Sequence, residues 1–222
     1  MEVDSDDKLM FRVLQCEMCK NDDRTRGLIP ERCYPVYSFG DPENKEVITV
    51  GLNPSRIEYE KGFLSRDPRP EKRAESQLSY FQVGRHHHTY FDALDGYFSQ
   101  KAKRLLQCKE HMWENVGFLD LVKCVTIKAK SDKNQWGGLK RIPKEAIIGN
   151  CEDYLMQQIW FYRPKLLISY GQDATHWIER NRRRLPEDIR CTWIPQRRYQ
   201  KTKDFRKHKL RLEREIIKWK AE

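Results

Sequence analysis

The sequence has no run of about 18 consecutive apolar residues, so it offers no candidate for a membrane-spanning helix. Its first seven residues, Met1 to Asp7, lack the basic and apolar regions of a secretion signal. No stretch rich in glycine, serine or proline divides the 222 residues, and no segment is repeated. We therefore expect a soluble, cytoplasmic protein that folds as one domain, 1–222.

Seven cysteines are present, and an odd number cannot all pair within one chain. In the reducing compartment that we expect, metal binding or simple burial explains cysteines better than a disulfide framework does. Cys33, Cys108 and Cys191 are expected to be small buried hydrophobic residues.

The positive charge is concentrated at one end of the chain. Residues 180–222 hold 16 of the 43 basic and 6 of the 33 acidic residues, so this part carries the whole net charge of +10. A solvated helix is one explanation. The other is a polyanion partner, which we favour because aromatic residues lie among the cations, as contacts to phosphates and bases require: Trp193, Tyr199, Phe205 and Trp219.

Strands and helices are expected to alternate along the chain. Short runs rich in β-branched and other apolar residues predict strands over 46–51, 116–122, 165–170 and 189–194. Helical patterns are found over 90–106, 143–162, 173–184 and 203–220. The prediction is an α/β fold with a single domain, in which a central parallel four-stranded sheet has helices on both faces. Loops 51–65, 123–142 and 194–202 would then share the rim at the carboxyl ends of the strands, where such sheets bind ligands.

The segment Gly51-Leu52-Asn53-Pro54-Ser55 follows the first predicted strand. Alone it is also an ordinary turn. It resembles the first catalytic motif of the uracil-DNA glycosylase superfamily, especially its mismatch-specific and single-strand-selective branches. Residues 118–124 and 163–171 are similar to the thermostable, iron–sulfur branch of the same superfamily. The resemblance runs from about Cys16 to Trp177 and implies an enzyme that excises a base from DNA and leaves an abasic site.

The resemblance also implies a 4Fe–4S cluster. Cys16 and Cys19, near the N-terminus, and the distant Cys124 and Cys151 match its four thiolate ligands. Residues 1–45 would form the cluster-binding segment, and the cluster would be structural. Tetrahedral zinc fits the same four residues chemically and remains an alternative, which a zinc-dependent nucleic-acid binder would use.

Within the family motif, Asn53 is the expected catalytic residue. Its side-chain oxygen would hold the water that attacks the sugar, and the backbone of the loop around Leu52 would stabilise the departing base. The target nucleotide must be flipped out of the duplex, and an aromatic side chain commonly forms the pocket wall. Phe63 is our candidate, with Tyr59 and Phe81 as alternatives, although each is equally explained as a core residue.

Asp120 stands where uracil-removing relatives carry an asparagine that reads the base. An ionised carboxylate only accepts hydrogen bonds. It would therefore repel O4 of uracil, which is also an acceptor, but it can accept a hydrogen bond from the exocyclic amine of cytosine. We expect a cytosine derivative enlarged at position 5, as in hypermodified phage DNA, because a host enzyme aimed at plain cytosine would destroy its own genome. A purely structural Asp120 and a repair enzyme for uracil or mismatched thymine are the alternatives.

The distal family motif, which contains a histidine, is replaced here by Ile194-Pro195-Gln196. We expect Gln196 to contact the base, and the residues after it to contact phosphates or to fill the gap left by the flipped nucleotide: Arg197, Arg198, Tyr199 and Lys201. The missing histidine also permits a DNA-binding module that has lost catalysis. Either protein would be a nucleoid-associated monomer that binds single- or double-stranded DNA.

Overall fold

The computed structural model describes residues 5–30, 32–82, 89–126, 141–195 and 203–222. Its centre is a sheet of four parallel strands, in the order β2-β1-β3-β4. The strands are β1 (Val47–Gly51), β2 (Val116–Asp120), β3 (Leu166–Tyr170) and β4 (Arg190–Ile194). Each lies within a run predicted from the sequence, so the α/β class and the parallel four-stranded sheet are confirmed.

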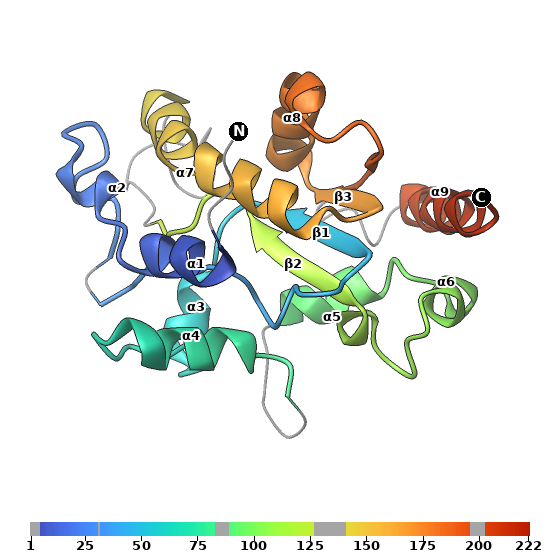
Figure 1. The fold of residues 1–222 in the computed structure, drawn as a ribbon, viewed down its shortest axis with the longest axis horizontal. Coiled ribbons are helices and arrows are strands. Elements are labelled where there is room, and N and C mark those ends of the chain that lie inside the picture. The colour runs from blue at the N-terminus through green and yellow to red at the C-terminus, as the bar shows by residue number, and fades with distance from the viewer. Residues whose placement is uncertain (1–4, 31, 83–88, 127–140, 196–202) are drawn as a thin grey trace.

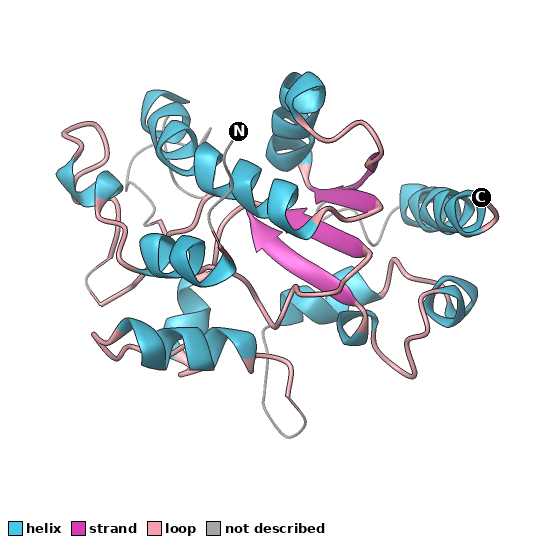
Figure 2. Cartoon of the chain, in the orientation of Figure 1, coloured by secondary structure: helices cyan, strands magenta, loops and turns pink. Residues whose placement is uncertain are grey.

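The helices of the described segments surround this sheet (Figures 1 and 2). They are α1 (Asp6–Leu14), α2 (Met18–Asn21), α3 (Arg56–Glu60), α4 (Pro70–Leu78), α5 (Thr89–Asp95), α6 (Gln100–Leu105), α7 (Arg141–Tyr162), α8 (Gln172–Asn181) and α9 (Lys203–Lys220), with short 3₁₀ turns at Met112–Glu114 and Arg182–Arg184. None of them is long and apolar enough to cross a membrane. The helix predicted over 90–106 is divided in two, because Ser99 accepts a hydrogen bond from the Ala102 N–H at 3.0 Å and begins α6 as a new helix.

The strands β1, β2 and β3 are buried on both faces, which explains why they are nearly continuous apolar runs, whereas the edge strand β4 is only partly buried. Val47 lies in a core with residues of α5, α6 and α9. Its neighbour Ile48 points to the opposite face and lies in a second core with residues of α7 and α8. Figure 1 shows α7 and α8 on one side of the sheet and α5 and α6 on the other.

The N-terminal segment is attached to the outside of α7. Helix α1 packs against α7 and α4. The Asp6 carboxylate accepts hydrogen bonds from the hydroxyls of Tyr37, at 2.5 Å, and Tyr162, at 2.6 Å. Because Tyr162 is the last residue of α7, these contacts join the start of the chain to the layer that covers the sheet.

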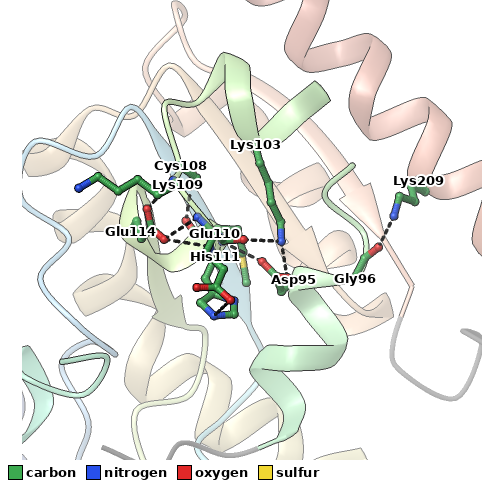
Figure 3. A network of polar contacts seen from close by, with 10 residues as sticks. Asp95, Gly96, Lys103, Cys108, Lys109, Glu110, His111, Glu114 and Lys209 are labelled. Carbon is green, nitrogen blue, oxygen red and sulfur yellow. Dashed lines mark hydrogen bonds and ion pairs between the residues drawn. The ribbon is translucent and has the colours of Figure 1, made fainter. Parts of the chain in front are cut away.

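A polar network holds the loop that leads into β2 (Figure 3). The Glu114 carboxylate accepts hydrogen bonds from the backbone N–H groups of residues 109, 110 and 111, at 2.6 to 2.9 Å. The buried Lys103 ammonium lies 2.5 Å from the Asp95 carboxylate and donates to the Glu110 carbonyl at 2.9 Å. The network immediately precedes β2, so it lies at the amino end of that strand, and we interpret it as structural.

Candidate active site

A cavity of about 230 Å³ lies at the carboxyl ends of β1 and β2. Its apolar wall is mainly aromatic and consists of Phe39, Tyr90, Phe91, Phe118, Leu119 and Pro54. Its polar groups come from the β1–α3 turn, from α3 and from the end of β2: Asn53, Ser55, Glu58 and Asp120. A largely aromatic cavity with a few converging polar groups is the usual form of a small-ligand site, and this one lies at the predicted rim.

The turn between β1 and α3 is tightly held. The Val122 N–H donates to the carbonyl of Leu52 at 2.8 Å, which continues the pairing of β1 with β2 beyond the strands themselves. Pro54 disfavours a helical conformation at Asn53. Ser55 then caps α3, because its hydroxyl accepts a hydrogen bond from the backbone N–H two residues ahead at 3.3 Å.

Asn53 lies in this turn and lines the cavity. Its side-chain nitrogen donates to the carbonyl of Pro54 at 3.0 Å. This bond orients the amide and leaves the side-chain oxygen to accept a hydrogen bond from a water molecule. The arrangement is compatible with the predicted water-holding role, which remains a prediction.

Asp120, the last residue of β2, is only 7% exposed. It pairs with Gly51 of β1, and a Cβ atom on that glycine would lie 2.6 Å from Asp120 Oδ1 and 2.9 Å from the Tyr90 hydroxyl oxygen. The absence of a side chain at Gly51 therefore makes room for the carboxyl group. Within the described part of the chain, Asp120 Oδ2 is buried and has no hydrogen-bond partner.

An unsatisfied buried acceptor costs about 1–3 kcal/mol. In a cavity, a ligand that donates a hydrogen bond removes that cost. Burial raises the pKa of Asp120, and the nearby Lys123 ammonium opposes the rise. Lys123 is itself buried and donates to Oε1 of Gln158 at 2.5 Å, while Gln158 donates to the carbonyl of Tyr37 at 2.9 Å. These hydrogen bonds hold the Lys123 ammonium in place.

Glu58 is a cavity residue that the sequence did not reveal. It is 2% exposed, and the Tyr80 hydroxyl donates a hydrogen bond to its Oε2. Burial raises the Glu58 pKa to about 8, the charge of Asp120 adds to the rise, and the Tyr80 hydrogen bond opposes it. The pattern Ser55-x-x-Glu58 is typical of a capping box, which would place Glu58 at an exposed helix start. Its side chain turns instead to Tyr80 and the cavity.

Two other predicted base-binding residues lie away from the cavity lining. Phe63 is partly buried and packs against the core on the α5 side of the sheet. Leu52 packs against the core on the α7 side. The alternatives Tyr59 and Phe81 also belong to the α5-side core. Other aromatic residues form the wall of the cavity. The sequence did not identify them, because tertiary packing decides whether an aromatic side chain faces the cavity or the core.

The remaining predicted contacts of the distal loop, Gln196, Arg197, Arg198, Tyr199 and Lys201, lie outside the described residues. Phe205 and Trp219 are partly buried, and their predicted contact with DNA stays a prediction. Phe205 packs on Tyr97, with ring centroids 4.6 Å apart, and both Phe205 and Trp219 pack against the core. Trp193 is 38% exposed, and the Arg211 guanidinium lies 4.0 Å from the centre of its ring.

The four predicted cluster cysteines approach one another beside α7. The thiols of Cys19 and Cys151 share a hydrogen bond, which lowers the pKa of Cys19 and raises that of Cys151. Cys124 interacts electrostatically with Cys19 and with Cys16, and burial raises its pKa. The Asn150 amide donates to Cys19 Sγ at 3.7 Å. No three His, Cys, Asp or Glu side chains of the described residues are arranged as ligands of a single ion.

The protein is thus an α/β domain with a cavity at the carboxyl rim of a parallel sheet, which is where such sheets bind ligands. Residues 37–217 match the family described as the Uracil DNA glycosylase superfamily. This match spans most of the chain, so the protein belongs to that superfamily. Among curated proteins, none matches the chain significantly.

Membership in the superfamily makes DNA the partner and base excision the class of activity. The matched region contains Asn53, Glu58 and Asp120 and two of the four cluster cysteines, Cys124 and Cys151. It begins after Cys16 and Cys19, so the family match does not extend to that pair.

Proposed function

We propose that the protein is a DNA glycosylase that removes a flipped-out base bearing an exocyclic amine, of the cytosine type. The main supporting observation is that Asp120 lines the cavity and that its buried Oδ2 has no hydrogen-bond partner among the described residues. A carboxylate oxygen accepts a hydrogen bond from the amine of cytosine. Uracil would bring its O4, a second acceptor, against the same oxygen. Asp120 therefore favours the amine-bearing base.

The other cavity residues support hydrolysis of the N-glycosidic bond. Aromatic side chains enclose the base, and Asn53 Oδ1 holds the attacking water at the sugar. The bond between C1′ and N1 breaks with its electron pair moving to the base, and the water oxygen bonds to C1′. Asparagine cannot act as a base, so the water proton passes to solvent. Catalysis then depends on positioning and electrostatics.

The chemistry of the target also limits its biological source. An enzyme that removed unmodified cytosine would destroy the genome that encodes it. We propose that the base carries a substituent at position 5 that host DNA lacks, as in hypermodified phage DNA, so that the activity serves defence. The alternative is repair of uracil or of mismatched thymine, which the experiment below separates from it.

The test is mass spectrometry of bases released from single- and double-stranded DNA containing uracil, a G·T mismatch, cytosine or 5-substituted cytosines. We expect release of a 5-substituted cytosine, with alkali-labile sites in the DNA, and no release by Asn53→Ala. The matched control is Gln100→Ala, which removes an exposed amide from α6. Release of uracil in preference to every cytosine derivative would overturn the substrate proposal. DNA binding without release of any base would identify a module that has lost catalysis.

We further propose that Cys16, Cys19, Cys124 and Cys151 hold a 4Fe–4S cluster. Their mutual interactions support a common site. The cluster would connect the N-terminal segment to α7 and to the end of β2, and it would supply structural rigidity.

Metal analysis of the purified protein tests this proposal. We expect iron and sulfide in equal amounts and broad absorbance near about 400 nm, which thiolate ligation of iron produces. Cys151→Ser should remove the absorbance, whereas Cys191→Ser, in β4, should retain it. Stoichiometric zinc without iron would show that the alternative is correct.

A further inference from the structure

Two carboxyl groups share the cavity. Glu58 comes from α3 and Asp120 from β2, and both side chains are more than nine-tenths buried. The surrounding wall is largely aromatic. Two carboxylates in such a space repel each other and are poorly solvated, so one of them keeps its proton near neutral pH.

The surroundings of the pair determine which group keeps the proton. Burial raises the pKa of Asp120 and the positive charge of Lys123 opposes the rise, while the hydroxyl of Tyr90 lies near Gly51, as Asp120 Oδ1 does. Among the described residues, the groups that set the Glu58 pKa are Tyr80 and Asp120, and neither is a cation. Burial raises the pKa of Glu58 to about 8 and that of Asp120 to about 7, so Asp120 ionises first as pH rises and Glu58 keeps its proton longer. Since Tyr80 donates to Glu58 Oε2, the proton resides on Oε1.

We propose that Glu58 is a second catalytic residue, which donates its proton to ring atom N3 of the amine-bearing base so that the base departs as a neutral molecule. The inference rests on the proposed function. On the edge of cytosine, the N4 amine is a donor and the adjacent N3 is an acceptor. Ionised Asp120 accepts from the amine, and Glu58 Oε1–H donates to N3. Uracil already carries hydrogen on N3 and cannot take this proton.

The reaction is balanced as follows. The proton of Glu58 Oε1 moves to N3 while the C1′–N1 bond breaks and its electron pair passes to the base. The base leaves as a neutral cytosine tautomer rather than as an anion. Water adds to C1′ and releases its proton to solvent, and the Glu58 carboxylate regains a proton from solvent after the base departs.

This role also accounts for the altered distal motif. The family histidine, which would stabilise a negatively charged leaving base, is absent from Ile194-Pro195-Gln196. A base that departs neutral needs no such group.

Single-turnover rates of base release, measured against pH, test the proposal. Wild-type protein should lose rate as pH rises above about 8, where Glu58 ionises. Glu58→Gln keeps a donor for N3 but cannot transfer a proton, so the rate should fall about 100- to 10,000-fold while the affinity for uncleaved DNA is retained. Glu58→Asp should restore part of the rate. The control is Glu60→Gln, an exposed carboxyl of the same helix, which should leave the rate unchanged.

Tyr80→Phe provides a second test, because the pH profile of base release should shift only if Glu58 donates a proton and not if Glu58 is merely structural. The Tyr80 hydrogen bond lowers the Glu58 pKa, so its loss should move the alkaline limb of the profile to higher pH. If wild-type protein releases no base from any DNA, the proposed function itself is wrong. If it releases a base, but Glu58→Gln leaves the rate and the pH profile unchanged, only the proton-donor role is wrong.

Discussion

Replacement of Glu58 by glutamine should change how the stability of the protein depends on pH. The buried Glu58 is protonated in the folded protein at neutral pH, because burial raises its pKa from 4.5 to about 8. In the unfolded chain the same carboxyl is exposed and ionises near its ordinary pKa. A raised folded-state pKa stabilises the protein fully below the unfolded pKa, and this stabilisation is lost as pH rises through the folded value.

The magnitude follows from the size of the rise. Each pKa unit corresponds to about 1.4 kcal/mol, so between pH 5.5 and pH 7.5 the contribution of Glu58 to the free energy of unfolding should fall by roughly 2–3 kcal/mol. Glutamine has nearly the shape of a protonated glutamate and can still accept from Tyr80, but it does not titrate. The free energy of unfolding of Glu58→Gln should therefore increase relative to that of wild type as pH rises.

Urea unfolding of both proteins at several pH values measures this difference. Groups that titrate in both proteins cancel when the two free energies are subtracted. The exposed Glu60→Gln should show no such trend, because the Glu60 side chain forms a surface ion pair with Arg56. A difference between wild type and Glu58→Gln that stays constant from pH 5.5 to pH 7.5 would refute a protonated Glu58, and with it the proton donor proposed above.

Three further predictions concern the cavity and the basic helix. Asp120→Asn supplies an amide that can satisfy both N3–H and O4 of uracil, so base-release assays should show a gain of uracil excision and a loss of activity on the amine-bearing base. Gly51→Ala places a methyl group against Asp120 Oδ1, so thermal or urea unfolding should show a loss of about 1–3 kcal/mol, and base release should fall. Neutralising the exposed cations Arg206, Lys207 and Arg214 of α9 should weaken DNA binding and flatten its salt dependence, whereas an unchanged slope would remove this helix from the interface.

Much of the sheet could be predicted because β1, β2 and β3 are buried on both faces and are therefore short apolar runs. The first four helices could not be predicted in the same way. Helix α4 (Pro70–Leu78) contains few apolar residues, and its buried face includes the polar side chains of Arg73 and Gln77. Gln77 donates to the carbonyl of Pro35 at 3.1 Å and accepts from the Tyr37 N–H at 2.7 Å. Helices that pack through such polar contacts show little hydrophobic periodicity.

The candidate site was predictable where a residue type departs from a family motif, as at Asp120, and where a motif contains the residue, as at Asn53. The packing of the aromatic residues of α9 could not be predicted from their position among the cations. Phe205, Leu212 and Trp219 recur at intervals of seven residues, which places them on one helical face, and that face packs against the core. The cations lie on the other faces, so proximity along the chain did not mean a shared surface.

The chemistry of the cavity depends on the register between two strands that are far apart in the chain. Gly51 and Asp120 are paired at the carboxyl ends of β1 and β2. A shift of β2 by one residue would turn the carboxyl to the other face of the sheet. Any larger residue than glycine at position 51 would occupy the space of Asp120 Oδ1. A substitution at position 120 that alters the preferred base therefore also needs a compatible residue at position 51. The specificity of this site depends on both positions rather than on Asp120 alone.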